Sequence, residues 1–420
     1  MSFQQGLSGL NATSKNLQVI GNNIANANTF GAKVARAEFS DMYAIALNGA
    51  GSNNIGIGTN LAVVSQQFTQ GNITTTENPM DLAINGAGFF QLTDGRSPVT
   101  YSRNGQCKLD RDGFVVNNAG LRLMGYAADA GGAIQPGQAV PLQLPTAGVA
   151  PQPTTSIDME MNLDARQGIT RPAAAPFIDF NDADTYNSAT SLAVYDVLGN
   201  PVSLTYYFQK TADGAWDVYA TANGATVAGT AAAPTPITSI TFPADGSAPT
   251  APTAPVAFDI PATTTSSGAL TQPITGVLFD VTSATQFGSP FGVTNLTQDG
   301  FAAGQITAVS IEANGVVMAR YSNGQSRPAG QVELANFRNP QGLQPIGDNG
   351  WMRTFASGDP VGGVPGDGNI GVLQSGALEE PNIDLTSELV SMITAQRIYQ
   401  ANAQTIKTQD QVLQTLVNLR

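Results

Sequence analysis

Apolar residues recur every seventh position at both ends of the chain, and this spacing predicts a helix at each end. The N-terminal stripe, over residues 3 to about 27, consists of Phe3, Leu7, Leu10, Leu17, Ile20 and Ile24. The C-terminal stripe consists of Leu385, Leu389, Met392, Tyr399, Ile406, Leu413 and Val417. Seven-residue spacing is typical of a helix that packs along another helix. Asn382 or Asp384, after Pro381, is the expected N-cap of the second helix.

Two arrangements of these helices fit the pattern. In the first, each amphipathic helix packs separately on a globular core. In the second, which we favour, the two termini form a coiled coil with each other. The seam is imperfect because Ser14, Gln396 and Asp410 fall on it. The polar flanks would then need neighbouring molecules to cover them.

The middle of the chain predicts β-sheet. It is rich in Asn-Gly and Asp-Gly dipeptides, the strongest short hairpin signals, of which the chain has thirteen. Alternating apolar residues from Val202 to Phe208 precede Asp213-Gly214, and similar runs flank Asn314-Gly315. Between about 221 and 275, where Ala, Thr, Pro, Gly and Ser dominate, we expect short surface strands with long loops. The fold class is therefore mainly β with α-helical termini.

A Gly/Asn-rich loop, residues 48–60, lies between the N-terminal helix and the first β region. It is either a flexible connector or a loop that orders only against a neighbouring molecule.

Composition narrows the function classes. The 420 residues carry a formal charge of −13, only 12% of them are charged, and there is one Cys and no His. Without His, no imidazole base or ligand is available, and one Cys cannot form an intramolecular disulfide framework. Few cations argue against nucleic acid as a partner. Low charge suits a surface that packs against copies of itself. The length and the 42% apolar content allow two to three domains, each with a core.

Candidate chemical motifs are weak. Gly86-x-Gly88 before Phe89 lacks the Lys-Ser/Thr of a phosphate loop. The acidic run Asp179, Asp182 and Asp184 lacks the spacing and closing Glu of a calcium loop, so a solvated loop is the better interpretation. We therefore expect no catalytic residue, metal or cofactor, and no enzyme.

Three further side chains are candidate reactive groups: two adjacent carboxylates and the single thiol. The adjacent carboxylates Glu379-Glu380 are expected on an exposed segment. Cys107, in an alternating run, is expected to be a buried small hydrophobe, with a reactive thiol as the alternative.

Targeting signals are not evident from general rules. The first cation is Lys15, no basic region precedes an apolar run, and no stretch approaches eighteen apolar residues. These rules alone would place the protein in the cytoplasm.

Four blocks carry a resemblance to a known family. The first runs Leu7-Ser8-Gly9-Leu10-Asn11-Ala12 and then, from Leu17 to Lys33, LQVIGNNIANANTFGAK, which contains Asn22, Asn23 and Asn26. The second runs Asn78-Pro79-Met80-Asp81-Leu82-Ala83-Ile84-Asn85-Gly86-Ala87-Gly88-Phe89-Phe90, and the third Tyr101-Ser102-Arg103-Asn104-Gly105. The fourth extends from Asp384 to Thr408 and closes with Leu416-Val417-Asn418-Leu419-Arg420. Together they resemble the bacterial flagellar rod and hook proteins.

The resemblance implies a nested architecture. Residues 1–28 and 382–420 would form an inner coiled-coil domain. Residues 29–70 and 361–381 would form a connecting region with a flexible loop. Residues 71–145 and 301–360 would form a β domain, and 146–300 an outer β domain.

The resemblance also implies a function and a location. The closing residues and the central insertion favour the hook branch, a curved tube that acts as a universal joint, and the alternative is a rigid rod subunit. Expected partners are copies of itself, the distal rod protein, hook–filament junction proteins, the hook cap and the type III export apparatus. The expected location then becomes the flagellum, outside the cell after export. A secreted enzyme or adhesin is the rival of another class.

This chain departs from the family pattern at two positions. Cys107 and Ala32 stand where family members commonly carry an aromatic residue, and both positions bear on local packing. Cys107 is either natural variation or an introduced labelling site.

Overall fold

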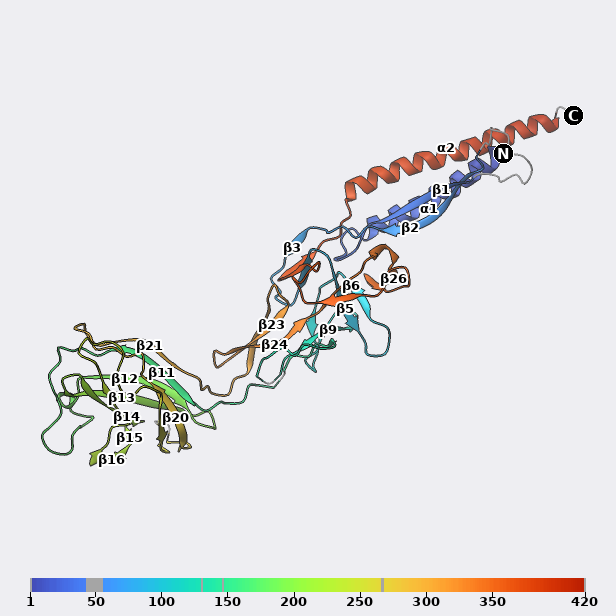
Figure 1. The fold of residues 1–420 in the computed structure, drawn as a ribbon. Coiled ribbons are helices and arrows are strands. Elements are labelled where there is room, and N and C mark those ends of the chain that lie inside the picture. Colours follow the sequence, from blue (N-terminus) through green and yellow to red (C-terminus); the bar gives the residue numbers. More distant parts are fainter. Residues whose placement is uncertain (1, 43–55, 130, 146, 266–267, 419–420) are drawn as a thin grey trace. The chain divides into compact units, whose positions relative to one another are not determined.

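The computed structural model describes residues 2–42, 56–129, 131–145, 147–265 and 268–418, and it is mainly β with a helix at each end (Figure 1). The chain divides into two compact units. The first unit comprises Met1–Thr146, Thr307–Arg320 and Ser326–Arg420, and the second comprises Ala147–Ile306 and Tyr321–Gln325. The predicted fold class is thus confirmed.

The two helices begin and end close to where the pattern places them. Helix α1 spans Ser2–Ala25 and helix α2 spans Leu385–Asn418. Asp384 is the N-cap of α2, because its carboxylate accepts the backbone N–H groups of Thr386 and Ser387. Asn382 has another role: its side chain accepts from the N–H of Val34 at 2.8 Å and so fixes the segment after α1. Neither helix, over its described residues, has the length and apolar content needed to cross a bilayer.

Short strands join distant parts of the chain in the first unit. Strands β1 (Ala35–Met42) and β2 (Gly58–Gln66) pair with each other, β3 (Ile73–Thr75) pairs with β30 (Ala377–Glu379), and β4 (Leu82–Asn85) pairs with β29 (Val372–Ser375). Residues 48–55 of the Gly/Asn-rich loop lie outside the described residues, and its end forms the start of β2.

A larger sheet carries the core of the first unit. Its main path runs through β22 (Ile306–Ile311), β23 (Val316–Tyr321), β24 (Ser326–Val332), β9 (Arg122–Ala127), β5 (Phe89–Thr93), β6 (Thr100–Ser102), β27 (Gly350–Met352) and β26 (Gln344–Gly347). Shorter strands flank it: β7 (Lys108–Leu109), β8 (Val115–Val116), β10 (Val140–Pro141), β25 (Leu334–Asn336) and β28 (Val361–Gly363), with the 3-10 helix η2 (Pro340–Gly342). Phe89, Tyr101, Phe337 and Trp351 form its aromatic core, with rings packed edge to face.

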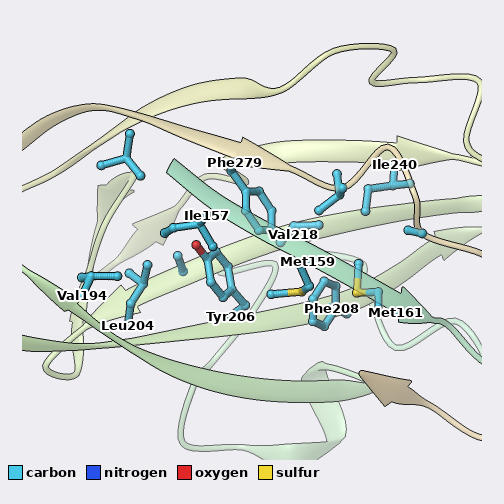
Figure 2. Packing of buried hydrophobic residues seen from close by; sticks show 14 of the residues in the cluster. Ile157, Met159, Met161, Val194, Leu204, Tyr206, Phe208, Val218, Ile240 and Phe279 are labelled. Atoms are coloured by element: carbon cyan, nitrogen blue, oxygen red, sulfur yellow. The ribbon is translucent and has the colours of Figure 1, made fainter. Parts of the chain in front are cut away.

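Two sheets enclose the core of the second unit. One runs β19 (Val256–Ile260), β20 (Ile274–Asp280), β11 (Ser156–Asn162) and β21 (Gly292–Gln298). The other runs β12 (Ser188–Tyr195), β13 (Pro201–Ala212), β14 (Ala215–Ala222) and β15 (Ala225–Thr226), with β18 (Thr238–Thr241) beside β14. The hairpin β16 (Gly229–Thr230) and β17 (Ala233–Pro234) and the 3-10 helix η1 (Ala183–Thr185) lie outside both. Tyr206 from β13 stacks on Phe279 from β20 at 4.6 Å between centroids (Figure 2).

The structure confirms the turns predicted at one Asp-Gly and one Asn-Gly dipeptide. Asp213-Gly214 joins β13 to β14, and Asn314-Gly315 joins β22 to β23. Gly214 and Gly315 have φ of 74° and 81°, the left-handed conformation that glycine adopts without strain.

The short strands predicted between 221 and 275 are present as β15 to β19, but the expectation that they lie at the surface is wrong for β18 and β19. Ile240 of β18 and Ile260 of β19 are fully buried and belong to the core of the second unit. Apolar side chains are few and widely spaced in this stretch, but Ile240 and Ile260 both belong to one core cluster. The polar composition of this stretch therefore belongs to the loops and to the outer faces of its strands.

Candidate functional site

The two terminal helices pack antiparallel along each other (Figure 1). A Cβ added at Gly6 would lie 3.1 Å from a side-chain carbon of Ile406, and one at Gly9 would lie 2.9 Å from the amide of Asn402. Further along, the Asn23 amide donates to the Glu388 carboxylate at 3.3 Å. The missing side chains at two glycines thus let the helix backbones approach closely, as small residues do in other helix pairs.

The buried face of α1 shares only Ile20 with the predicted stripe. The buried positions are Gly6, Thr13 and Ile20, which are seven residues apart, and Asn23. Of the predicted stripe, Phe3 and Leu7 are exposed, Leu10, Leu17 and Ile24 are half-buried, and Ile20 is buried. A search for apolar residues overlooks Gly6 and Thr13, because their contribution is small size and not hydrophobicity.

On α2, apolar side chains remain uncovered. Ala395 is buried, and Met392 and Ile406 are half-buried. The exposed members of the predicted stripe are Leu385, Leu389, Tyr399 and Leu413, and the side chain of Val417 lies outside the described ones. Leu385, Leu389 and Ile393, with exposed fractions of 46%, 43% and 52%, follow one another at four-residue spacing and share one face. We call these three residues the α2 stripe.

The asparagines of the first motif fix the end of α1. Asn23 is buried, and its amide both donates to the carbonyl of Ala35 at 2.8 Å and accepts its N–H at 3.0 Å. Asn26 donates to the carbonyl of Asn22 at 2.9 Å. These bonds hold the first residue of β1 against the helix, so the motif is structural in the monomer.

The second motif fixes a turn and a close backbone approach. The Asp81 carboxylate accepts from the Thr76 hydroxyl and the Asn78 amide, and the Pro79 carbonyl accepts from Ser375. At Gly86, with φ of 117°, a Cβ would lie 2.9 Å from the Cα of Gly371. Gly88 also has positive φ, and Phe89 lies in the aromatic core. These glycines therefore serve backbone packing.

Glu379 corrects the sequence expectation, because it is buried and not exposed. Its carboxylate contacts the Lys33 ammonium at 2.6 Å and the Arg103 guanidinium at 3.2 Å, and all three side chains are at most 4% exposed. The backbone N–H of Gly71 also donates to it, at 2.9 Å. We call Lys33, Arg103 and Glu379 the ion cluster. Its adjacent residue Glu380 is half-buried.

Burial sets the electrostatics of the ion cluster. Desolvation lowers the pKa of Lys33 and that of Arg103, and attraction to Glu379 opposes both shifts. The cluster joins three segments that the sequence gives no reason to connect: the one after α1, the one after β6, and β30. Sequence reasoning missed it, since each member is an isolated charged residue.

The remaining candidates are structural as well. Cys107 is buried as predicted, and burial, with the charge of Asp81, raises the pKa of its thiol to about 12. Asp182 accepts the N–H of Asp184 within an exposed loop, and Asp179 similarly accepts from Asn181. Among the described residues, no group of three or more Cys, Asp or Glu side chains is arranged to hold a metal ion.

Ala32 stands where family members commonly carry an aromatic residue, and its position shows what the smaller side chain changes. It is buried and lines a polar cavity of 210 Å³ together with Asn23, Lys33 and Trp351. A small side chain here leaves space beside the ion cluster.

Family models match most of the chain in succession. They are "Flagella basal body rod protein" (residues 3–33), "Flagellar hook protein FlgE/F/G D1 domain" (83–162), "Flagellar basal body protein FlaE D2 domain" (162–301) and "Flagellar basal body rod FlgEFG protein C-terminal" (374–419). The chain has terminal helices that pair with each other, β strands between them in sequence, and the motifs of these families. These features define its class: an axial protein of the bacterial flagellum.

Individual relatives specify the branch. The chain is 42% identical to flagellar hook protein FlgE of Salmonella typhimurium and of Escherichia coli K12, over the whole of both chains. It is 34% identical to that of Rhizobium meliloti, covering 100% of this chain and 98% of the relative. The chain therefore belongs to the flagellar hook protein family, a structural component of the basal body–hook. The hook branch is thus supported over the rod, and the cytoplasmic location expected from general rules is wrong.

A solved structure supports the fold. Flagellar hook protein FlgE2 of Helicobacter pylori matches with a TM-score of 0.54 at 15% identity, covering 73% of this chain and 100% of that one. At this identity the likeness concerns the fold alone.

Proposed function

We propose that this chain polymerises with itself into the curved, bendable tube between the motor's rod and the filament, and that the tube transmits torque. The observation that carries the proposal is the α2 stripe, which the chain's own α1 leaves uncovered. A helix with an uncovered apolar face is stabilised by a neighbour that buries it. In this family, the neighbour is a second copy.

The geometry of the helix pair suits a torsionally stiff inner layer. Helices that lie along one another with glycines at the contact resist sliding, because their backbones are close and their side chains interlock. A contact between two different surfaces of successive copies does not close on itself and generates a helical filament. We infer that residues 1–28 and 382–420 form this layer, residues 29–70 and 361–381 its connection, and 71–145 and 301–360 the next.

Bending of the tube requires weaker contacts outside the inner helical layer, and we assign these contacts to residues 146–300. With only 12% charged residues in the chain, its surfaces make few strong directional contacts that a shift would break.

We further propose the distal rod protein, the hook–filament junction proteins, the hook cap and the type III export apparatus as partners. The role is mechanical and requires no enzymatic activity.

A charged substitution in the α2 stripe tests the proposal. We expect Leu389→Asp to abolish polymerisation of the purified full-length chain, measured by sedimentation and electron microscopy. Leu389 is already exposed, so the unfolding curve of the monomer should stay unchanged. Ile169→Asp, at an exposed apolar position in the second unit, is the control and should polymerise. Normal tubes from Leu389→Asp would overturn the proposal.

A further inference from the structure

The loop between β27 and β28 presents a phenylalanine to solvent. Phe355 has a relative exposure of 105%, the largest of any apolar side chain among the described residues. Burying such a side chain is worth about 1.5–3 kcal/mol. A free monomer therefore gains nothing from a phenylalanine at this position.

The loop is held rigidly, so this exposure belongs to a defined conformation. The Thr354 hydroxyl donates to the carbonyl of Gly342 at 2.5 Å, and the Asn339 amide donates to the carbonyl of Ala356 at 3.0 Å. Ser357 is buried, and its hydroxyl donates to the carbonyl of Thr354 at 2.8 Å. The Arg353 guanidinium pairs with the Asp359 carboxylate across the base of the loop. Together these bonds present Phe355 as a fixed knob.

A groove on the same unit has the chemistry to receive such a knob. Its volume is 510 Å³, and Val361, Gly363 and Ile370 contribute to its lining. Val361 is 65% exposed, so apolar surface is accessible in the groove. Phe355 does not line it.

Charged side chains flank both the groove and the knob. Arg338 and Asp367 both line the groove and are exposed, and neither has an ion-pair partner among the described residues. The knob carries one cation and one anion, Arg353 and Asp359. Opposite charges on the two rims would set the orientation of the contact more than its strength.

We propose that Phe355 of one copy inserts into this groove of the next copy in the polymer. The inference rests on the proposed self-assembly and specifies one of its contacts. A second copy is the occupant because the family is a polymer-forming one and the chain itself carries both complementary surfaces. Phe355 is not part of the groove that it would enter, so one copy can offer its knob to one neighbour and its groove to another, and such a contact can repeat along a polymer.

Substitutions on the two sides of the contact test the proposal in the full-length chain. We expect Phe355→Ala to raise the critical concentration for polymerisation, measured by sedimentation, about tenfold or more, as a central interface aromatic does. Val361→Asp should have a similar effect. Leu109→Ala, at another exposed apolar residue of the first unit, is the matched control and should behave as the unaltered chain does.

The double variant distinguishes one contact from two. If knob and groove meet, Phe355→Ala combined with Val361→Asp should be no weaker than the worse single variant. Additive effects, or wild-type polymerisation by Phe355→Ala, would overturn the inference. Failure of the unaltered chain and of Leu109→Ala to polymerise would instead overturn the proposed self-assembly.

Discussion

At the scale of single residues, the ion cluster is the most consequential arrangement. One carboxylate, Glu379, neutralises two cations that reach it from segments far apart in sequence. A buried charge without its partner costs far more than an exposed one, because no water replaces the lost interaction. Glu379 therefore determines whether Lys33 and Arg103 can stay buried.

Removal of the Glu379 charge should destabilise the first unit strongly. We expect Glu379→Gln to lower its free energy of unfolding by about 3–5 kcal/mol, since two buried cations lose their counter-ion. The measurement is urea unfolding followed by the fluorescence of Trp351, in a Trp216→Phe background, because these two tryptophans lie in different units. Glu380→Gln is the adjacent control and should change stability by about 0.5 kcal/mol or less. An equal effect of both would contradict the role of the cluster.

At the scale of elements, the contact between α1 and α2 depends on side chains that are absent. Gly6 and Gly9 face α2, whereas Gly21 of the same helix has no atom within 4 Å of an added Cβ. Glycine therefore has opposite effects on stability at different positions of α1. At Gly6 and Gly9 it permits close packing, and at Gly21 it only weakens the helix.

Glycine substitutions should separate these two roles. We expect Gly6→Leu combined with Gly9→Leu to open the helix pair, at a cost of about 1–3 kcal/mol for overpacking. Gly21→Ala should instead stabilise α1 by about 1 kcal/mol, through helix propensity alone. Amide hydrogen exchange of residues 399–409 measures both effects: faster exchange in the first variant, and unchanged or slower exchange in the second. Unchanged exchange in the double leucine variant would contradict the packing described.

The same elements show what the sequence could and could not predict. Heptad spacing placed both helices, and Asp213-Gly214 and Asn314-Gly315 placed hairpins, because these signals are local. The buried face of α1 was not predictable from hydrophobicity, since Gly6 and Thr13 occupy it. The burial of Glu379 was not predictable either, because it depends on partners 346 and 276 residues away.

At the scale of the whole molecule, each unit has a hydrophobic core of its own. A unit with its own core can unfold on its own, so the chain has no single unfolding equilibrium. Trp216 and Trp351 then report two different events in one molecule. This division lets the contacts of one unit change while the other stays folded.

Replacement of residues 147–305 by a short Gly/Ser linker should leave the first unit intact. We expect the Trp351 unfolding transition to shift by about 0.5 kcal/mol or less. The variant should still form tubes, with altered curvature, as seen by electron microscopy. A chain with the same linker inserted after Gly224, at the exposed turn between β14 and β15 of the second unit, controls for the linker itself. Loss of the Trp351 transition, or of all polymer, would count against independent units.

The strand pairs of the first unit also set an order of events during synthesis. The second unit is almost contiguous in sequence, so all of it exists once residue 325 has been made. In the first unit Ile73 pairs with Glu379, so the β3–β30 pair cannot form until the last tenth or so of the chain emerges. A chain made only to residue 325 therefore contains every residue of the second unit but neither the groove nor α2. The contacts proposed for polymerisation can therefore form only after the C-terminal part of the chain has been synthesised.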